Sequence, residues 1–119
     1  MSEEVSKKFI ALYLAPVSVL DDWAKTDPET RKAAEQKMQT EWKKWMADHA
    51  KKIALTEAGG KTKRVTASGV ADVRNEIMLY SVVEAQSHEA AAKLFENHPH
   101  LQIPHSSIEV MEAKSLGGM

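Results

Sequence analysis

The sequence predicts one α+β domain whose core elements follow the order β-α-β-β-α-β. Three observations lead to this prediction. Residues 8–14 and 76–85 are short segments with apolar side chains on both faces, which is typical of buried strands. Residues 28–50 carry apolar side chains at helical spacing. Residues 87–112 begin with a helix cap, pass through a proline stop and end in an alternating strand.

The first predicted strand, residues 8–14, ends before Pro16. Both of its faces are apolar, which indicates a strand that is covered on both sides. The alternating positions are Phe9, Ala11 and Tyr13 on one face, and Ile10, Leu12 and Leu14 on the other. A short helix over residues 17–25 is expected to follow.

The second helix has two possible starts. Thr26 can cap it together with Glu29 in a capping box, or Asp27 can cap it with Pro28 in the first turn. The apolar side chains at helical spacing fall on one side, and the other side is polar. This stripe consists of Ala34, Met38, Trp42, Trp45, Met46 and His49. The pattern predicts an amphipathic helix that lies on a sheet.

The middle of the chain predicts a second strand over residues 52–57 and a turn over 58–61. Residues 64–67 are expected to pair back as a hairpin arm. Residues 68–75 include a glycine and an aspartate and are expected to form a loop. The apolar strand over 76–85 follows.

The last helix is predicted to start at Ser87, which can cap it, and to stop before Pro99. Its inward stripe is Ala91, Leu94, Phe95 and His98. Residues 107–112 form the last strand. Right-handed crossovers place both helices on one face of the sheet, so the order predicts a ferredoxin-like antiparallel sheet with helices on one face.

The other face of this sheet would be bare in a monomer, although its strands are apolar on that side too. A bare apolar face indicates an interface, so we expect a homodimer whose sheets stack face to face. The alternative is a monomer whose loops and tail cover the face. Residues 1–119 are expected to form a single domain, with flexible tails at 1–7 and 115–119.

Composition excludes several classes of function. The net charge of −1 argues against nucleic acid as a partner, because binding to phosphates needs a basic excess. The chain has no cysteine, which excludes disulfides and thiolate chemistry. No apolar run reaches membrane-spanning length, and the polar N-terminal stretch does not read as a signal peptide. A cytoplasmic protein without membrane partners is expected.

The chain resembles the YCII-related family, including its DGPF-type branch. The resemblance covers residues 9–114 and depends on an ordered set of segments: Phe9-Ile10-Ala11-Leu12-Tyr13, Tyr80-Ser81-Val82-Val83-Glu84-Ala85 leading into Ser87-His88-Glu89-Ala90-Ala91, His98-Pro99-His100-Leu101, and Ser107-Ile108-Glu109-Val110. The resemblance implies a ferredoxin-like fold assembled as a dimeric αβ barrel.

The resemblance implies less about activity. Some members resemble dehydrochlorinases, and one branch has a His-Asp pair that uses a histidine shortly after the first strand. The corresponding residues here, 15–18, contain no histidine, and residues 67–72 replace the Asp-Gly-Pro-Phe motif. Neither set of functional residues is therefore carried over.

His98 and His100 are the candidates for catalysis. Pro99 forces His98 toward an extended conformation and ends the helix, so both imidazoles are expected at a helix C-terminus, where one of them can serve as a general base. The alternative is structural: His98 completes the apolar stripe and His100 bonds a loop carbonyl. His105 extends the spacing to that of a possible zinc site, but no carboxylate lies within it, and no metal or other cofactor is expected.

Aromatic and polar side chains on several elements are expected to line a pocket for a small aromatic or apolar molecule. The candidate substrate-binding residues are Tyr13, Trp42, Trp45, His49, Arg64 and Tyr80. The expected function is binding of such a molecule by a dimer. If the protein is an enzyme, the histidines would assist proton transfer or elimination, as in a lyase or isomerase. The alternative is a non-catalytic binding or interaction module that acts through its dimer.

Overall fold

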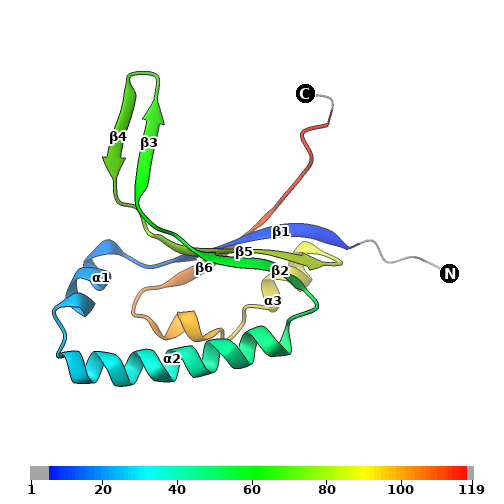
Figure 1. Ribbon diagram of the computed structural model, residues 1–119. Coiled ribbons are helices and arrows are strands. Elements are labelled where there is room, and N and C mark those ends of the chain that lie inside the picture. Colours follow the sequence, from blue (N-terminus) through cyan, green and yellow to red (C-terminus); the bar gives the residue numbers. More distant parts are fainter. Residues whose placement is uncertain (1–5, 118–119) are drawn as a thin grey trace.

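The computed structural model describes residues 6–117 (Figure 1). Its elements, in chain order, are β1 (Lys7–Leu14), α1 (Val17–Ala24), α2 (Pro28–Asp48), β2 (Ile53–Ala58), β3 (Thr62–Thr66), β4 (Gly69–Val73), β5 (Ile77–Ala85), α3 (His88–Lys93), the 3-10 helix η1 (Pro99–Gln102) and β6 (Ser107–Glu112). Lys7, placed in the N-terminal tail by the sequence, is the first residue of β1. The remainder of the two predicted tails lies partly outside the described residues.

Four strands form one antiparallel sheet in the order β2-β5-β1-β6. The predicted β-α-β-β-α-β order is confirmed once the hairpin of β3 and β4 is set aside, because β1, β2, β5 and β6 are the core strands. The helices lie on one face of this sheet (Figure 1). The chain therefore has an α+β fold, and no helix of residues 6–117 lies on the second sheet face.

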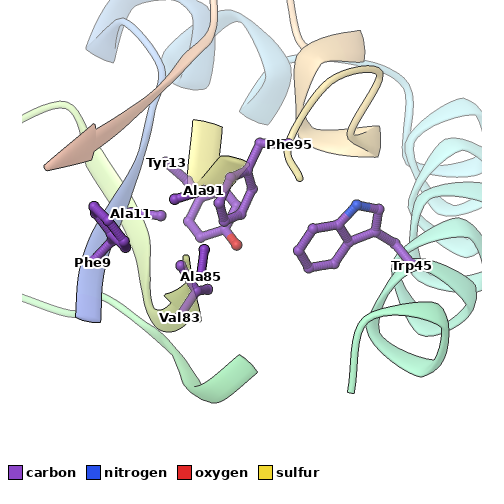
Figure 2. Packing of buried hydrophobic residues seen from close by; sticks show 8 residues of the cluster. All are labelled: Phe9, Ala11, Tyr13, Trp45, Val83, Ala85, Ala91 and Phe95. Atoms are coloured by element: carbon purple, nitrogen blue, oxygen red, sulfur yellow. The ribbon is translucent and has the colours of Figure 1, made fainter. Parts of the chain in front are cut away.

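The core lies between the sheet and the helices. Phe9, Ala11 and Tyr13 of β1 are buried there, as the alternation predicts. Figure 2 shows Trp45 reaching from α2 toward the side chain of Phe95. The rings of these two residues stack with centroids 5.3 Å apart. The other face of β1 is only half-buried within this chain, so the prediction of a strand covered on both sides is met on one side.

Asp27 is the residue that caps α2. Its Oδ2 accepts a hydrogen bond from the backbone N–H of Thr30 at 3.1 Å, and Pro28 follows in the first turn. The Thr26 hydroxyl instead donates to the carbonyl of Asp22 at 3.2 Å. The predicted apolar stripe is buried or half-buried from Met38 onward, whereas Ala34 is exposed. The helix therefore uses only its C-terminal part to cover the core.

The prediction of a loop over residues 68–75 is wrong, because Gly69–Val73 forms β4. β4 pairs with β3 in a separate two-stranded sheet, in which Thr66 faces Gly69 and Val65 faces Val70. Residues 64–67 were predicted to pair with the strand before them, but β3 pairs instead with β4, which follows it. A two-residue connection joins the strands, and Gly69 opens β4 at a φ of +132°, which an L side chain rarely adopts. The glycine that suggested a loop is what allows the tight turn.

The hairpin of β3 and β4 rises from the side of the sheet opposite the helices, and the C-terminal segment after β6 rises on the same side (Figure 1). The radius of gyration is 16.9 Å, against about 13.5 Å for a compact domain of this length. This larger radius agrees with a projecting hairpin, and within residues 6–117 neither the hairpin nor the segment after β6 lies flat on the second sheet face (Figure 1).

Candidate functional site

His98 and Pro99 form the start of η1. The backbone of His98 is extended, with a ψ of 141°, as expected for a residue before proline. Its Nδ1 accepts a hydrogen bond from the backbone N–H of His100 at 2.9 Å, so the imidazole caps this short helix. The side chain is 1% exposed. The sequence placed both histidines at the C-terminal end of the last helix, which is wrong: α3 ends at Lys93, and His98 instead lies at the start of η1, with its ring buried in the core.

Aromatic rings surround His98. Its ring centroid lies 4.4 Å from those of Trp42 and Trp45 and 5.3 Å from that of Tyr13. Because Nδ1 accepts a hydrogen bond, the neutral ring must carry its proton on Nε2. That nitrogen is buried and has no hydrogen-bond partner within the described part of the chain. Both tryptophan rings meet the imidazole edge to face.

The pKa of His98 is lowered to about 3, mainly by burial, with smaller contributions in the same direction from the nearby imidazoles of His100 and His49. The charged ring would lose its hydration without gaining an acceptor for its second proton. His98 is therefore a neutral group at physiological pH.

His100 joins three parts of the chain. Its Nε2 lies 2.9 Å from the carbonyl oxygen of Leu14 at the end of β1. Its own carbonyl accepts a hydrogen bond from the Ser106 hydroxyl at 3.0 Å. Burial lowers the pKa of His100, while hydrogen bonds to the backbone of Leu14 and Ser107 act in the opposite direction. His100 thus holds η1 against the ends of β1 and β6.

A chain of three hydroxyls crosses the core beside these histidines. The Tyr13 and Ser81 oxygens are 2.7 Å apart, and the Ser81 and Thr56 oxygens are also 2.7 Å apart. Burial raises the pKa of Tyr13 to about 12, although the bond to Ser81 opposes this shift. The sequence analysis missed this network. Ser81 could have indicated the network, because it is a polar residue on an otherwise apolar face of the strand.

A cavity of about 380 Å³ lies where α2, β5 and η1 meet. Its lining is largely apolar, with one imidazole, one amide and one ammonium group. The lining residues are Met38, Gln39, Trp42, Lys43, Met78, Leu79, His100 and Ile103. Two of the predicted site residues, Trp42 and His100, line it. Met38 was assigned to the stripe of the long helix, whereas Met78, Leu79 and Ile103 were not singled out.

Three further predicted residues lie behind the cavity. Tyr13, Trp45 and His98 belong to the buried aromatic cluster that backs on Trp42. His49 stands beside this cluster: its ring stacks on Trp45 at 4.5 Å, and its Nδ1 lies 2.8 Å from the Trp45 carbonyl oxygen. These four residues support the wall of the cavity rather than line it.

Arg64 and Tyr80 are not brought to this site. Arg64 lies in β3 of the hairpin and is exposed. Tyr80 faces away from the helices, and its hydroxyl donates to the Glu57 carboxylate, which raises the pKa of Tyr80. The sequence placed them together with the aromatic residues because it did not reveal on which side of the sheet each would lie.

A second, larger space of about 980 Å³ opens at the base of the hairpin. Two ion pairs hold charged residues around it. Arg74 meets Asp21 at 2.9 Å, and Lys63 meets Asp72 at 2.6 Å. Two of the three cations that line this space, Lys63 and Arg74, therefore have an acidic partner, whereas Lys61 makes no ion pair among the described residues.

The described residues contain no group of three or more histidine, aspartate or glutamate side chains that could hold a metal ion. His98 and His100 are buried, whereas His105 is exposed at a φ of +60°. No helix among residues 6–117 combines the length and the apolar character that a membrane crossing requires.

Comparisons with known proteins assign no family to the chain. No family model matches it, and no curated protein matches it. Among solved structures, it is similar to an unknown protein from Galdieria sulphuraria, with 10% sequence identity and a TM-score of 0.34. The match covers 94% of this chain and 47% of that one, so the chain spans about half the length of the solved protein.

Proposed function

We propose that this chain is a homodimeric small-molecule-binding protein that takes a small aromatic or otherwise apolar organic molecule into the cavity between α2, β5 and η1. The observation that carries the proposal is the size and lining of that cavity. Its volume of about 380 Å³ falls within the range of known ligand pockets, which combine apolar walls with a few polar groups.

The lining favours a ring with one polar substituent. Trp42 and Met38 offer a polarisable surface for an aromatic ring. Lys43 and Gln39 supply a positive charge and an amide on the same helix. An aromatic acid or a phenol satisfies both features, because its ring packs on the apolar wall and its oxygen meets the polar groups.

We place binding ahead of catalysis because of the state of the two histidines. His98 is buried, with its Nδ1 already bonded and its pKa lowered to about 3, which makes it a weak base. His100 lines the cavity, but its Nε2 is bonded to the Leu14 carbonyl. If the protein catalyses proton transfer or elimination, His100 is the base and His98 is a positioning residue behind it.

The homodimer belongs to the proposal because the sheet has an open face with apolar side chains at alternate positions. The strand order agrees with the ferredoxin-like arrangement from which dimeric αβ barrels are built. The YCII-related resemblance supports the same assembly. Its segments fall on β1, on β5 with α3, and on the stretch from His98 into β6, which are the parts of the chain around the aromatic cluster.

Thermal-shift measurements with benzoate, salicylate and phenol test the binding proposal, because a ligand that binds the native state raises the melting temperature. The matched variants are Met38→Trp, which fills the cavity, and Ala33→Trp, which adds the same ring at an exposed position of α2 outside the lining. We expect the wild type and Ala33→Trp to show a ligand-dependent shift of several degrees and Met38→Trp to show none. Equal shifts in both variants would contradict binding in this cavity.

The alternative, a non-catalytic interaction module acting through its dimer, is favoured by one observation. The hairpin of β3 and β4 presents Val65 and Val70 to solvent, and exposed apolar residues on a projecting element are a feature of protein contacts. The absence of a melting shift for a broad set of small aromatic compounds, in a protein that is dimeric, would support this alternative over ligand binding.

A further inference from the structure

The hairpin of β3 and β4 is an isolated element. We call residues 62–73 the arm. Among the described elements, β3 and β4 pack extensively only with each other. Val65 and Val70 face each other across the arm and are 75% and 65% exposed. A two-stranded hairpin without further packing is marginally stable in water, so the arm requires a surface to pack against.

The open face of the sheet offers such a surface. The strand register places a set of apolar side chains on the face away from the helices. This set, the open face, consists of Ile10, Leu12, Leu14, Leu55, Tyr80, Val82 and Met111. Met111 is 54% exposed. The arm rises on this side of the sheet but points away from it, so it does not cover the open face of its own chain (Figure 1).

The accessible surface of the chain is larger than that of a compact monomer of the same mass, which agrees with a missing partner. The chain exposes 8847 Å², whereas a compact monomer of 13.2 kDa is expected to expose about 6,400 Å². The excess is about 2,400 Å², and a standard interface buries about 800 Å² on each partner. The open face and the arm contribute to this excess, and a dimer that covers both would bury part of it.

The charges of the two surfaces are complementary. The arm and the residue before it contain three basic side chains and one acidic side chain: Lys61, Lys63, Arg64 and Asp72. The open face is bordered by Glu57, Glu84 and Glu109 and by one cation, Lys8. Arg64, Glu84 and Glu109 make no ion pair within the described residues. Lys63 lies on the face of the arm that carries Val65 and Val70 but already pairs with Asp72, whereas Arg64 lies on the reverse face. The opposite net charges therefore favour approach of the arm to the open face rather than one specific ion pair.

We infer that the arm of each copy docks on the open face of a second copy, with Val65 and Val70 packed against the partner's apolar side chains. This inference rests on the proposed homodimer and names the segment that holds it together. Two-fold symmetry makes the contact reciprocal, so each subunit gives one arm and receives one. The space of about 980 Å³ at the base of the arm is room between arm and sheet that the chain itself does not fill.

Charge substitutions on the two faces of the arm test this inference. Alternate residues of a strand point to opposite faces, so Val65 and Val70 share one face, and Thr66 and Ala71 lie on the other. We expect Val65→Lys with Val70→Lys to weaken the dimer at least tenfold in sedimentation equilibrium. The matched control, Thr66→Lys with Ala71→Lys, adds the same charge on the reverse face and should not weaken the dimer.

Removal of the arm is the second variant. The arm can be replaced by a short turn because Ala58 of β2 already pairs with Leu79 of β5. Replacing residues 61–75 with Asn-Gly should give a chain that melts cooperatively and is monomeric. An unchanged dimer in both the deletion and the valine variant would overturn the docking of the arm while leaving the homodimer intact. A wild type that stays monomeric at every concentration would instead overturn the homodimer proposal itself.

A cross-linking experiment identifies the docked surface directly. Because the chain has no cysteine, a single Val65→Cys variant can carry a benzophenone photo-cross-linker. Mixing ¹⁴N-labelled and ¹⁵N-labelled chains distinguishes contacts between subunits from contacts within one. Cross-links from residue 65 to peptides of β1, β5 or β6 of the other isotope are expected. Cross-links confined to peptides of the same isotope would contradict the inference.

Discussion

The two faces of the four-stranded sheet have similar sequence patterns but different surroundings. On the helix-covered face, Phe9 and Val83 are buried. On the open face, their chain neighbours Ile10 and Val82 are only half-buried. Both sets alternate along the same strands, and both are apolar. The difference between the faces therefore comes from what lies over each of them: helices on one face and, as we propose, a second subunit on the other.

Polar groups also differ between the two faces. On the covered face, the hydroxyls of Tyr13, Ser81 and Thr56 bond to one another, as buried polar groups must. On the open face, the Tyr80 hydroxyl bonds to the exposed Glu57 carboxylate. The hydroxyl groups of the covered face are thus satisfied within one chain, whereas the open face retains groups suited to an interface.

The largest effect is expected from placing a lysine on each face at adjacent positions of β5. Val83→Lys puts an unpaired charge into the core, which costs several kcal/mol and should unfold a domain of ordinary stability. Val82→Lys points to the open face, so the chain should keep its circular dichroism spectrum and lose its dimer. A dimeric Val82→Lys variant, or a folded Val83→Lys variant, would contradict this assignment of the faces.

The next largest effect is the loss of stability at acidic pH that the buried side chain of His98 causes. Because the pKa of His98 is lowered to about 3 in the folded chain, the unfolded chain binds more protons than the native one between about pH 3 and 6.5. Stability is therefore lost as the pH falls through that window. The contribution of His98 between pH 7 and pH 5 is about 2 kcal/mol. Urea unfolding at both pH values measures it.

His98→Asn tests this contribution, since the asparagine oxygen can accept the bond from the His100 N–H. The smaller side chain should lower stability at pH 7 by about 1–3 kcal/mol, and the loss of stability between pH 7 and pH 5 should shrink by about 2 kcal/mol. His105→Asn is the control, because His105 is exposed and its positive φ suits asparagine. An unchanged pH dependence in His98→Asn would show that His98 does not titrate as described.

The smallest expected effect is the difference in stability between the phenylalanine variants of Tyr13 and Tyr80. Tyr13→Phe removes a buried bond but leaves Ser81 bonded to Thr56, so the free energy of unfolding should fall by about 1 kcal/mol. Tyr80→Phe removes an exposed bond to Glu57 and should leave the unfolding of the subunit within experimental error. The reverse order of the two effects would mean that the buried hydroxyl network contributes nothing.

Much of the fold was predictable because local signals agreed with it. The last strand was predicted over the residues that form β6, and Asp27 was one of the two caps considered for α2. β4 was missed because Gly69 and Asp72 are common in loops. In the structure, Gly69 supplies the backbone angle of the turn and Asp72 pairs with Lys63 across the hairpin. Such pairing between strands is not visible in local propensity.

The site was predictable only in part. Pro99 explains the extended backbone of His98, although the last helix already ends at Lys93, and Trp42 and His100 do meet at a cavity. The contributions of Leu79 and Ile103 depend on how three elements meet, which no short pattern records. Arg64 was misplaced for the same reason, since its hairpin leaves the sheet on the side away from the helices.

The mass of the wild-type protein in solution tests the central claim most directly. Light scattering at micromolar concentration should return about twice the 13.2 kDa of one chain, because the open face and the arm each need the other copy. A mass equal to that of one chain across the accessible concentration range would contradict the account. The uncovered side of the sheet would then have to be stable in water by itself.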